Sequence, residues 1–305
     1  MIVWWALALA PGCNQILGLD QPADDDDDDD ARDHDARVID GPADRDMDGI
    51  VDGADLCPDV ADPGQYDEDG DGTGDRCDLC PHLDQADDTD DDEDGIHDAC
   101  DPYPGMSSGV LRFSGFHTGD EIDQWLVTGS GVATVVSDAL YLQPNLDAEM
   151  RATRIEDDSA AALTRVIAEV ELEPPNAGSI ARRAIGAITN VNTTTGATFF
   201  LCQIETDLPI SSVRLQEYRI DGPAATIATA TIATALPVGP VQLDFDIGYD
   251  PPQVGYGARC SLAVGSATNV LPRTTTIELA PGKSGVRTYG VPMRVNWVVL
   301  ISHPG

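Results

Sequence analysis

Three acidic segments of the chain follow one pattern: DRDMDGIVDGADLCP at residues 44–58, DEDGDGTGDRCDLCP at 67–81 and DDDEDGIHDACDP at 90–102. Their first residues are 23 positions apart in both cases. In every segment, aspartate occupies positions 1, 3, 5, 9 and 12, and glycine occupies position 6. A random acidic run would not keep this register, so the pattern indicates three copies of one unit, here called loops 1, 2 and 3.

The spacing of these aspartates predicts a calcium site in each loop. Calcium takes about six to eight oxygen ligands in a flexible shell. Carboxylates at positions 1, 3 and 5 of a tight loop point inward, and glycine at position 6 lets the backbone turn so that the position-7 carbonyl faces the ion. Side chains at positions 9 and 12 close the shell, directly or through water. The predicted ligands are Asp44, Asp46, Asp48, Asp52 and Asp55 in loop 1, Asp67, Asp69, Asp71, Asp75 and Asp78 in loop 2, and Asp90, Asp92, Asp94, Asp98 and Asp101 in loop 3.

The loops differ from EF-hands, although the first half of each is similar. Position 12 is Asp rather than Glu, and each loop is followed by Cys-Pro or Asp-Pro instead of an amphipathic helix. The three segments, together with the linking phrase CPHLDQADDTDDDEDGIHDACD at 80–101, resemble thrombospondin type 3 repeats over about residues 44–102. This resemblance implies calcium-binding loops that wrap into a compact stalk with almost no hydrophobic core, assigned to residues 44–104.

The cysteines of the repeats fit the same resemblance. Cys57 and Cys77 are 20 residues apart, as are Cys80 and Cys100. The resemblance implies that each pair forms a disulfide across consecutive loops. Each bridge would stabilise the segment by roughly 3 kcal/mol in the chain-entropy model. A zinc or redox site at the Cys77–Cys80 CxxC is the alternative, disfavoured by the surrounding aspartates and the lack of a second CxxC.

Charge is concentrated in the first third of the chain. Of the net charge of −37, Asp20–Asp101 contributes 34 acidic residues and only four arginines. A polyanion repels nucleic acid and anionic lipid and attracts cations, so nucleic-acid binding is disfavoured and metal ions are the expected partners. Seven consecutive aspartates, Asp24–Asp30, cannot collapse around a core, and residues 13–43 are predicted to form a disordered acidic tether.

The N-terminus has the features of an export signal. Residues 2–10 (IVWWALALA) are too short to span a bilayer but suit a signal-peptide core over residues 1–12. The following Cys13 ends a segment, APGC, that resembles a bacterial lipoprotein cleavage box, although no Lys or Arg precedes the apolar run and Ala10 stands where Leu is usual. The resemblance implies lipidation of Cys13 and outer-membrane sorting in a Gram-negative bacterium. A plain signal peptide or a buried N-terminal strand are the alternatives.

Residues 109–305 have the composition of a β-rich domain. Val, Ile, Thr and Ala alternate in short runs separated by Gly, Pro, Asn and Asp, and helical periodicity is hardly visible. Around ten to fourteen short strands indicate an antiparallel β-sandwich. The predicted strands are Val110–Ser114, Val132–Val136, Ala162–Glu173, Ala184–Val191, Ala197–Glu205, Val213–Ile220, Thr226–Thr234, Val241–Ile247, Gly257–Val264 and Val291–Ser302. Cys202 and Cys260 are expected to form a third disulfide.

Several local features resemble a concanavalin-like or laminin G-like jelly roll. The FSGF motif at 113–116, Trp125 and the phrase SGVATVVSDALYLQP at 130–144 resemble its early strands. The closing phrase GVRTYGVPMRVNWVVLIS at 285–302 resembles its last strand pair, with Val295, Trp297 and Val299 expected to alternate inward. The fold class predicted is therefore mainly β: an irregular calcium-stabilised repeat stalk followed by an antiparallel jelly-roll sandwich.

The β-rich domain offers few candidates for an active site. Glycosidases of this fold need paired carboxylates close together on one strand. Acids alternate on two predicted strands: Glu169, Glu171 and Glu173 on one, and Asp244 and Asp246 on the other. Neither set has the flanking pattern of those enzymes, so exposed acidic faces are favoured over a catalytic pair.

Histidines and aromatic residues of this domain give no stronger signal. His117 and His303 are isolated in the sequence, so no nucleophile–base pairing is predicted. Four aromatic residues would suit a sugar site, but core packing is favoured for most of them: Tyr249, Tyr256, Tyr289 and Trp125.

Together these observations predict a non-enzymatic, calcium-binding protein of the cell surface or outer membrane. The resemblances imply that a lipid anchor and a calcium-rigidified stalk present a lectin-like sandwich to glycans or other surface molecules. Two alternatives stay open: a polysaccharide hydrolase on the same jelly roll, and a purely structural spacer of the envelope.

Overall fold

The computed structural model describes most of the chain after residue 42. The described residues are 43–84, 89–107, 109–154, 161–172, 182–191, 199–207, 210–218, 225–232, 239–249, 256–264, 267–275 and 282–304. Cys13, the predicted signal peptide and nearly all of the predicted tether lie outside them. Residues 43–84 and 89–107 form turns and bends, with neither helix nor strand. No helix in the described part is long and apolar enough to cross a membrane.

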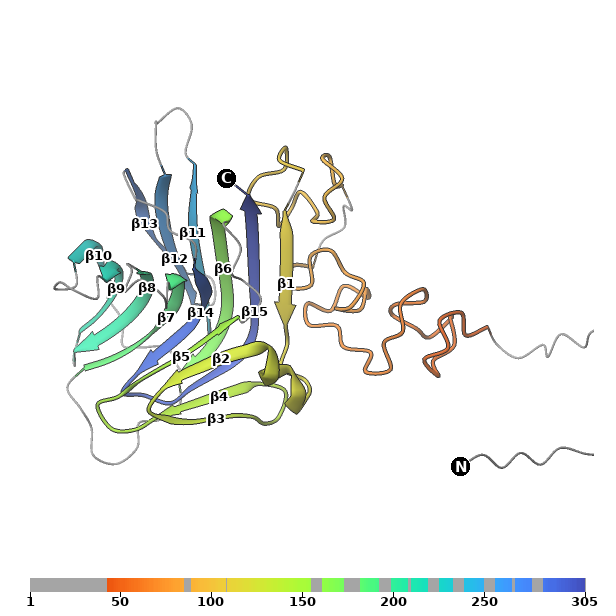
Figure 1. Ribbon diagram of the computed structural model, residues 1–305, viewed down its shortest axis with the longest axis horizontal. Coiled ribbons are helices and arrows are strands. Elements are labelled where there is room, and N and C mark those ends of the chain that lie inside the picture. Colours follow the sequence, from red (N-terminus) through yellow and green to blue (C-terminus); the bar gives the residue numbers. More distant parts are fainter. Residues whose placement is uncertain are drawn as a thin grey trace, which may run out of the picture. The chain divides into compact units, whose positions relative to one another are not determined.

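The described residues after the repeats form fifteen strands and one short 3-10 helix (Figure 1). They are β1 (Val110–Ser114), η1 (Gly119–Gln124), β2 (Trp125–Gly129), β3 (Gly131–Val135), β4 (Leu140–Pro144), β5 (Glu149–Arg154), β6 (Ala161–Leu172), β7 (Arg182–Val191), β8 (Phe199–Asp207), β9 (Ile210–Tyr218), β10 (Ala225–Ile232), β11 (Pro240–Tyr249), β12 (Tyr256–Val264), β13 (Ala267–Thr275), β14 (Lys283–Tyr289) and β15 (Met293–Pro304). The ten predicted strand regions all contain a strand. The alternation patterns missed β2, β4, β5, β13 and β14, but β4 and most of β14 lie in the phrases at 130–144 and 285–302 that the jelly-roll resemblance assigned to strands.

These strands form two antiparallel sheets. An eight-stranded sheet has the order β13-β12-β11-β6-β15-β4-β3, with β1 also paired to β15. A seven-stranded sheet has the order β10-β9-β8-β7-β14-β5-β2. The first and last strands lie side by side, as Figure 1 shows, with Val110 opposite Ser302. The predicted antiparallel β-sandwich is confirmed.

The main core lies between the two sheets. Side chains of a strand alternate between its faces, and on β6 and β11 every second residue is buried in this core: Val166, Ala168 and Val170, and Val241, Leu243, Phe245 and Ile247. Burial of each large aliphatic or aromatic side chain contributes about 1.5–3 kcal/mol. The Cys202–Cys260 disulfide connects β8 of one sheet with β12 of the other, and both cysteines are fully buried.

A β-bulge in β15 reverses the expected facing of its second half. The register between β15 and β6 shifts between Val295 and Trp297. Val295 therefore faces the main core, whereas Trp297 and Val299 belong to a separate cluster on the outer face of the eight-stranded sheet. The expectation that all three side chains point into the main core is wrong. The extra residue of a bulge shifts the alternation, so the residues after it point to the opposite face of the sheet from the one expected.

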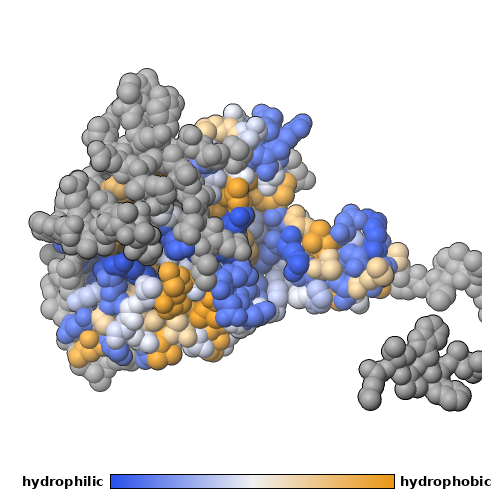
Figure 2. Space-filling view, in the orientation of Figure 1, coloured by the Kyte–Doolittle hydropathy of each residue, from blue (hydrophilic) through white to orange (hydrophobic). Residues whose placement is uncertain are grey.

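The repeat segment covers the apolar part of this outer face. A second buried cluster joins the Cys80–Cys100 disulfide and Ile96 of the repeats to residues of the sandwich: Ile167, Trp297, Val299 and Ile301, with Leu111 and Phe113 at its edge. The repeats contain few apolar residues of their own, and the sandwich provides the apolar surface against which these residues pack. Hydrophilic residues, blue in Figure 2, are prominent on the surface of the repeat segment.

Candidate metal centres

The first half of each loop brings its predicted ligands together. The carboxylates at positions 1, 3 and 5 approach within 4.8 Å of one another in loop 1 (Asp44, Asp46, Asp48), loop 2 (Asp67, Asp69, Asp71) and loop 3 (Asp90, Asp92, Asp94). Carboxylate oxygens at this density repel one another unless a cation or protons neutralise them.

The backbone of the loops explains this convergence. The position-6 glycines, Gly49, Gly72 and Gly95, have φ of 100°, 98° and 88°, a left-handed conformation that side chains disfavour. The position-6 amide donates to the position-1 carboxylate at 3.2, 3.1 and 2.9 Å in loops 1, 2 and 3. The position-7 amide donates to the position-5 carboxylate at 2.8, 2.7 and 3.0 Å. The three loops therefore share one local structure.

The carboxylate at position 9 closes each loop. Its Oδ1 accepts the position-2 amide at 2.9, 2.8 and 3.0 Å in loops 1, 2 and 3. The position-9 amide donates to the carbonyl just before position 1 at 2.8, 2.9 and 2.8 Å. In the described residues, position 9 is not part of the converging carboxylate sets. This side chain holds the loop ends together.

In the described part of the structure, at least two carboxylate oxygens of each loop are buried without a hydrogen-bond partner. At position 12, Oδ1 accepts the amide two residues later at 2.8, 2.7 and 2.8 Å. The second oxygen, Oδ2, has no partner at position 3 or at position 12 in any loop: Asp46 and Asp55, Asp69 and Asp78, Asp92 and Asp101. A buried polar atom without a partner is costly and rare. Six such oxygens at equivalent positions fit a bound cation with a preference for oxygen, such as calcium.

Burial raises the proton affinity of these carboxylates when no cation is present. Desolvation, reinforced by neighbouring carboxylates and opposed by a backbone hydrogen bond, raises the pKa of Asp78 to about 6. Desolvation also raises the pKa of Asp69 and Asp101. The metal-free loops are therefore stabilised by protons in acid, and this stabilisation is lost as pH rises through the folded-state pKa.

Calcium affinity should fall as the pH drops through about 6. Protons compete with calcium for Asp78 below its pKa of about 6, because a ligand carboxylate must be deprotonated. Calorimetry at a pH of about 7.5 and of about 5.5 should show weaker binding at the lower pH. Near pH 6, the binding enthalpy should also depend on the buffer, because protons are released. An affinity that is unchanged over this range would contradict the assignment of Asp78.

A histidine of the sandwich joins the third site. His303 of β15 is fully buried, and its Nε2 lies 3.1 Å from Oδ1 of Asp101. Ligand atoms of Asp94, Asp101 and His303 all lie within 4.8 Å of one another. The last strand of the sandwich thereby positions the position-12 carboxylate of loop 3.

A second histidine contacts loop 2. Nε2 of His117 lies 3.1 Å from Oδ2 of Asp75 and 4.0 Å from Glu68, and its ring stacks on Tyr66 with centroids 3.8 Å apart. Burial alone would lower the pKa of His117, but the hydrogen bond and charge of Asp75 outweigh it and raise the pKa. Burial raises the pKa of Glu68 to about 7. The sequence suggested that His117 and His303 are isolated, but both have a carboxylate partner. Sequence inspection missed these partners because they are 42 and 202 residues away.

The predicted disulfides of the repeats are present. Cys57 pairs with Cys77 and Cys80 with Cys100, with Cα–Cα distances of 5.7 and 6.0 Å.

One further acid has a ligand-like environment that the loop pattern did not include. Asp62 is 8% exposed, its Oδ2 has no hydrogen-bond partner, and its amide donates to Asp48 at 2.8 Å. It follows loop 1 at position 19, outside the repeated skeleton.

Three of the alternating acids of the sandwich, Glu169, Asp244 and Asp246, lie near polar or charged side chains. Asp246 is 2% exposed, so the expectation of an exposed acidic face on β11 is wrong. Arg259 lies 3.9 Å from Asp246 and from Asp244, and supplies opposite charge. Glu169 accepts a hydrogen bond from Asn296 at 2.8 Å. Glu173 lies outside the described residues.

Trp125 is a core residue, as favoured from the sequence. It is 4% exposed, its ring centroid lies 5.6 Å from that of Phe116, and its Nε1 donates to Ser114 at 3.3 Å. Tyr289 is half-buried at the end of β14. The side chains of Tyr249 and Tyr256 are outside the described part of the structure.

Comparison with known proteins finds similarity at the level of structure alone. No family model matches the chain, and no curated protein matches it. Peanut lectin in complex with a nine-residue peptide is 12% identical, with a TM-score of 0.47, covering 64% of this chain and 98% of the lectin. Basic winged bean lectin with Tn-antigen is 12% identical, with a TM-score of 0.45, covering 65% and 100%. The VIP36 exoplasmic/lumenal domain bound to calcium and Man2 is 9% identical, with a TM-score of 0.44, covering 58% and 80%.

Proposed function

We propose that this chain is a calcium-binding, non-enzymatic surface protein whose β-sandwich recognises glycans or other surface molecules. The observation that carries the calcium part is the recurrence of buried Oδ2 atoms without partners at positions 3 and 12 of all three loops. Carboxylates at positions 1, 3, 5 and 12 would hold the ions. Bound calcium would neutralise the clustered charge and so keep the loops closed.

The donor set fits calcium better than other common ions. The converging atoms of loops 1 and 2 are carboxylate oxygens. Zinc favours cysteine and histidine ligands, and magnesium demands near-ideal octahedral geometry and keeps several waters. The cysteines of the repeats are in disulfides and do not compete.

Calcium titration of the full chain by calorimetry, in excess magnesium, tests this part. We expect saturable binding of about three or more ions, one per loop at least, with a smaller hydrodynamic radius in the calcium-bound protein. Binding no stronger than that of magnesium would reduce the repeats to a charged spacer.

The recognition part is tested with an array of neutral and charged oligosaccharides, in calcium and in EDTA. We expect retention of a defined set of glycans in calcium. A protein that binds calcium but no glycan would support the alternative of a structural spacer.

The alternative of a polysaccharide hydrolase has less support in the described residues. Asp244 is held by two hydrogen bonds from Arg165, at 3.0 and 3.1 Å, so both of its carboxylate oxygens already have a partner within the sheet. Replacement of Glu169 and Glu171 with no loss of any detected glycanase activity would remove the other candidates.

The proposed location is the outer membrane or cell surface of a Gram-negative bacterium, with a lipid on Cys13. The APGC sequence supports this proposal. Incorporation of labelled palmitate that is abolished in Cys13→Ala is the expected result. Equal labelling of the two proteins would contradict lipidation at this cysteine.

A further inference from the structure

The outer face of the eight-stranded sheet changes character between β6 and β11. Ile167 of β6 pairs with Val299 of β15, and both are buried in the cluster under the repeat segment. On its other side Ile167 pairs with Asp244, which in turn pairs with Ser261, and both of these polar residues are half-buried. The apolar half of the face is thus covered by the repeats, and a polar half begins at their edge.

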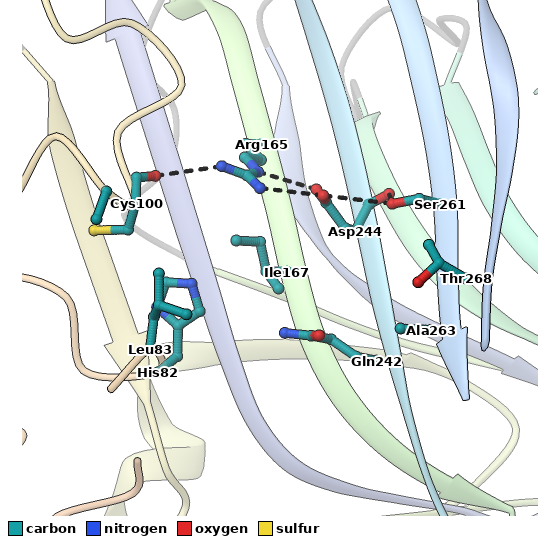
Figure 3. A pocket seen from close by; sticks show the side chains of 11 residues that line it. His82, Leu83, Cys100, Arg165, Ile167, Gln242, Asp244, Ser261, Ala263 and Thr268 are labelled. Carbon is teal, nitrogen blue, oxygen red and sulfur yellow. Dashed lines mark hydrogen bonds and ion pairs between the residues drawn. The ribbon is translucent and has the colours of Figure 1, made fainter. Parts of the chain in front are cut away.

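A cavity of about 250 Å³ lies at this boundary (Figure 3). His82 and Leu83 of the repeats form one side of it, as Figure 3 shows, and Ala263 and Thr268 lie on the opposite side. Gln242 lies between them. The cavity therefore combines hydroxyl and amide groups with short apolar surfaces.

A fixed ion pair marks one end of this boundary cavity. Arg165 donates to both carboxylate oxygens of Asp244, at 3.0 and 3.1 Å, and to the carbonyl of Cys100 at 3.3 Å. Ser261 approaches the same carboxylate at 3.4 Å. A carboxylate oxygen accepts more than one hydrogen bond, so Asp244 is both rigidly held and able to accept a ligand hydroxyl.

The described residues that line the boundary cavity carry no net charge near neutral pH. The charges of Arg165 and Asp244 cancel. Burial, reinforced by the charge of Arg165, lowers the pKa of His82 to about 4, so its imidazole is neutral. A charged ligand would lack a counter-ion here, and the net charge of −37 would repel an anion.

We propose that the boundary cavity binds a neutral, hydroxyl-rich ligand of about the size of one sugar ring. Pockets for drug-sized ligands measure roughly 300–1,000 Å³, so about 250 Å³ suits a smaller molecule. The amide of Gln242 and the hydroxyls of Ser261 and Thr268 supply both donors and acceptors. This inference rests on the proposed glycan recognition and adds its location and the charge class of its ligand.

The same geometry makes ligand binding depend on calcium. The Leu83 backbone lies beside the position-3 carboxylate of loop 2, Asp69. Cys100, whose carbonyl holds Arg165, precedes the position-12 ligand of loop 3, Asp101. Two of the proposed calcium ligands therefore fix the repeat side of the boundary cavity.

The test measures binding of glucose, galactose, mannose and N-acetylglucosamine to the full chain by saturation-transfer NMR, with glucuronate and glucosamine as charged probes. We expect at least one neutral sugar to bind in calcium with a Kd of roughly millimolar size, as a ligand of about twelve heavy atoms allows. Binding should be lost in EDTA.

Two variants locate the site. Ala263→Phe fills the boundary cavity and should weaken sugar binding at least tenfold, and Gln242→Ala should weaken it severalfold. Val132→Phe places the same ring at a 58%-exposed position of β3 and should change nothing. An unchanged calcium titration of each variant verifies that it is folded.

Other results would overturn the inference. Sugar binding that is unaffected by both cavity variants would place recognition elsewhere on the sandwich and leave the proposed function standing. Tighter binding of glucuronate or glucosamine would reject a neutral ligand. If no sugar of the panel binds but the oligosaccharide array is positive, the boundary cavity is not the binding site. If the array is also negative, the proposed glycan recognition itself is rejected.

Discussion

Asp92→Asn should weaken calcium binding at loop 3 by at least about tenfold, because ligand charge sets the affinity of such sites. Asp92 is the position-3 residue, and its Oδ2 is buried without a hydrogen-bond partner. Asparagine keeps the shape of the side chain but removes the charge that the ion would neutralise. Calorimetry should show one weakened site with the others unchanged.

Asp91→Asn is the matched control for this experiment. Asp91 is adjacent and carries the same charge, but its side chain is exposed and lies at position 2 of the loop. Its amide still donates to Asp98 after the substitution. Equal losses of affinity in the two variants would mean that calcium is held by general acidity, and the assignment of ligands by position would be wrong.

Ile96→Ala should destabilise the protein by about 2–5 kcal/mol, the usual cost of truncating a fully buried isoleucine. Ile96 is 1% exposed and packs with Trp297 and Ile301 on the outer face of the sheet. Its loss leaves a cavity between the repeats and the sandwich. Chemical denaturation in saturating calcium measures the change in the free energy of unfolding.

Leu79→Ala provides the comparison, because Leu79 is in the same segment but is 37% exposed. We expect it to cost less than about 1 kcal/mol. Hydrogen exchange should show faster exchange of repeat amides in Ile96→Ala only. Similar costs for the two variants would mean that the repeats do not depend on this apolar contact.

The shared conformation of the three acidic loops could be predicted from sequence because its determinants are local. Each predicted ligand set spans twelve residues. The sharp turn at position 6 requires a positive φ, which glycine adopts without steric cost. Three copies in one register remove most of the ambiguity. The sandwich could also be predicted, because apolar residues at every second position of strands such as β6 and β11 indicate which face of the strand is buried.

The contacts between repeats and sandwich could not be predicted in this way. His303 and Asp101 are separated by 202 residues, and no local pattern relates them. The facing of Trp297 depends on a one-residue bulge, which the alternation of apolar residues does not reveal. The boundary cavity could not be predicted either, because its two sides come from distant parts of the chain.

The most direct test of the calcium sites is anomalous diffraction from crystals of the full chain grown in calcium. We predict an anomalous peak in each loop, roughly 2.3–2.6 Å from the Oδ2 atoms of the residues at positions 3 and 12. Loops in which these oxygens bind water or protein donors, with no ion between them, would contradict the account.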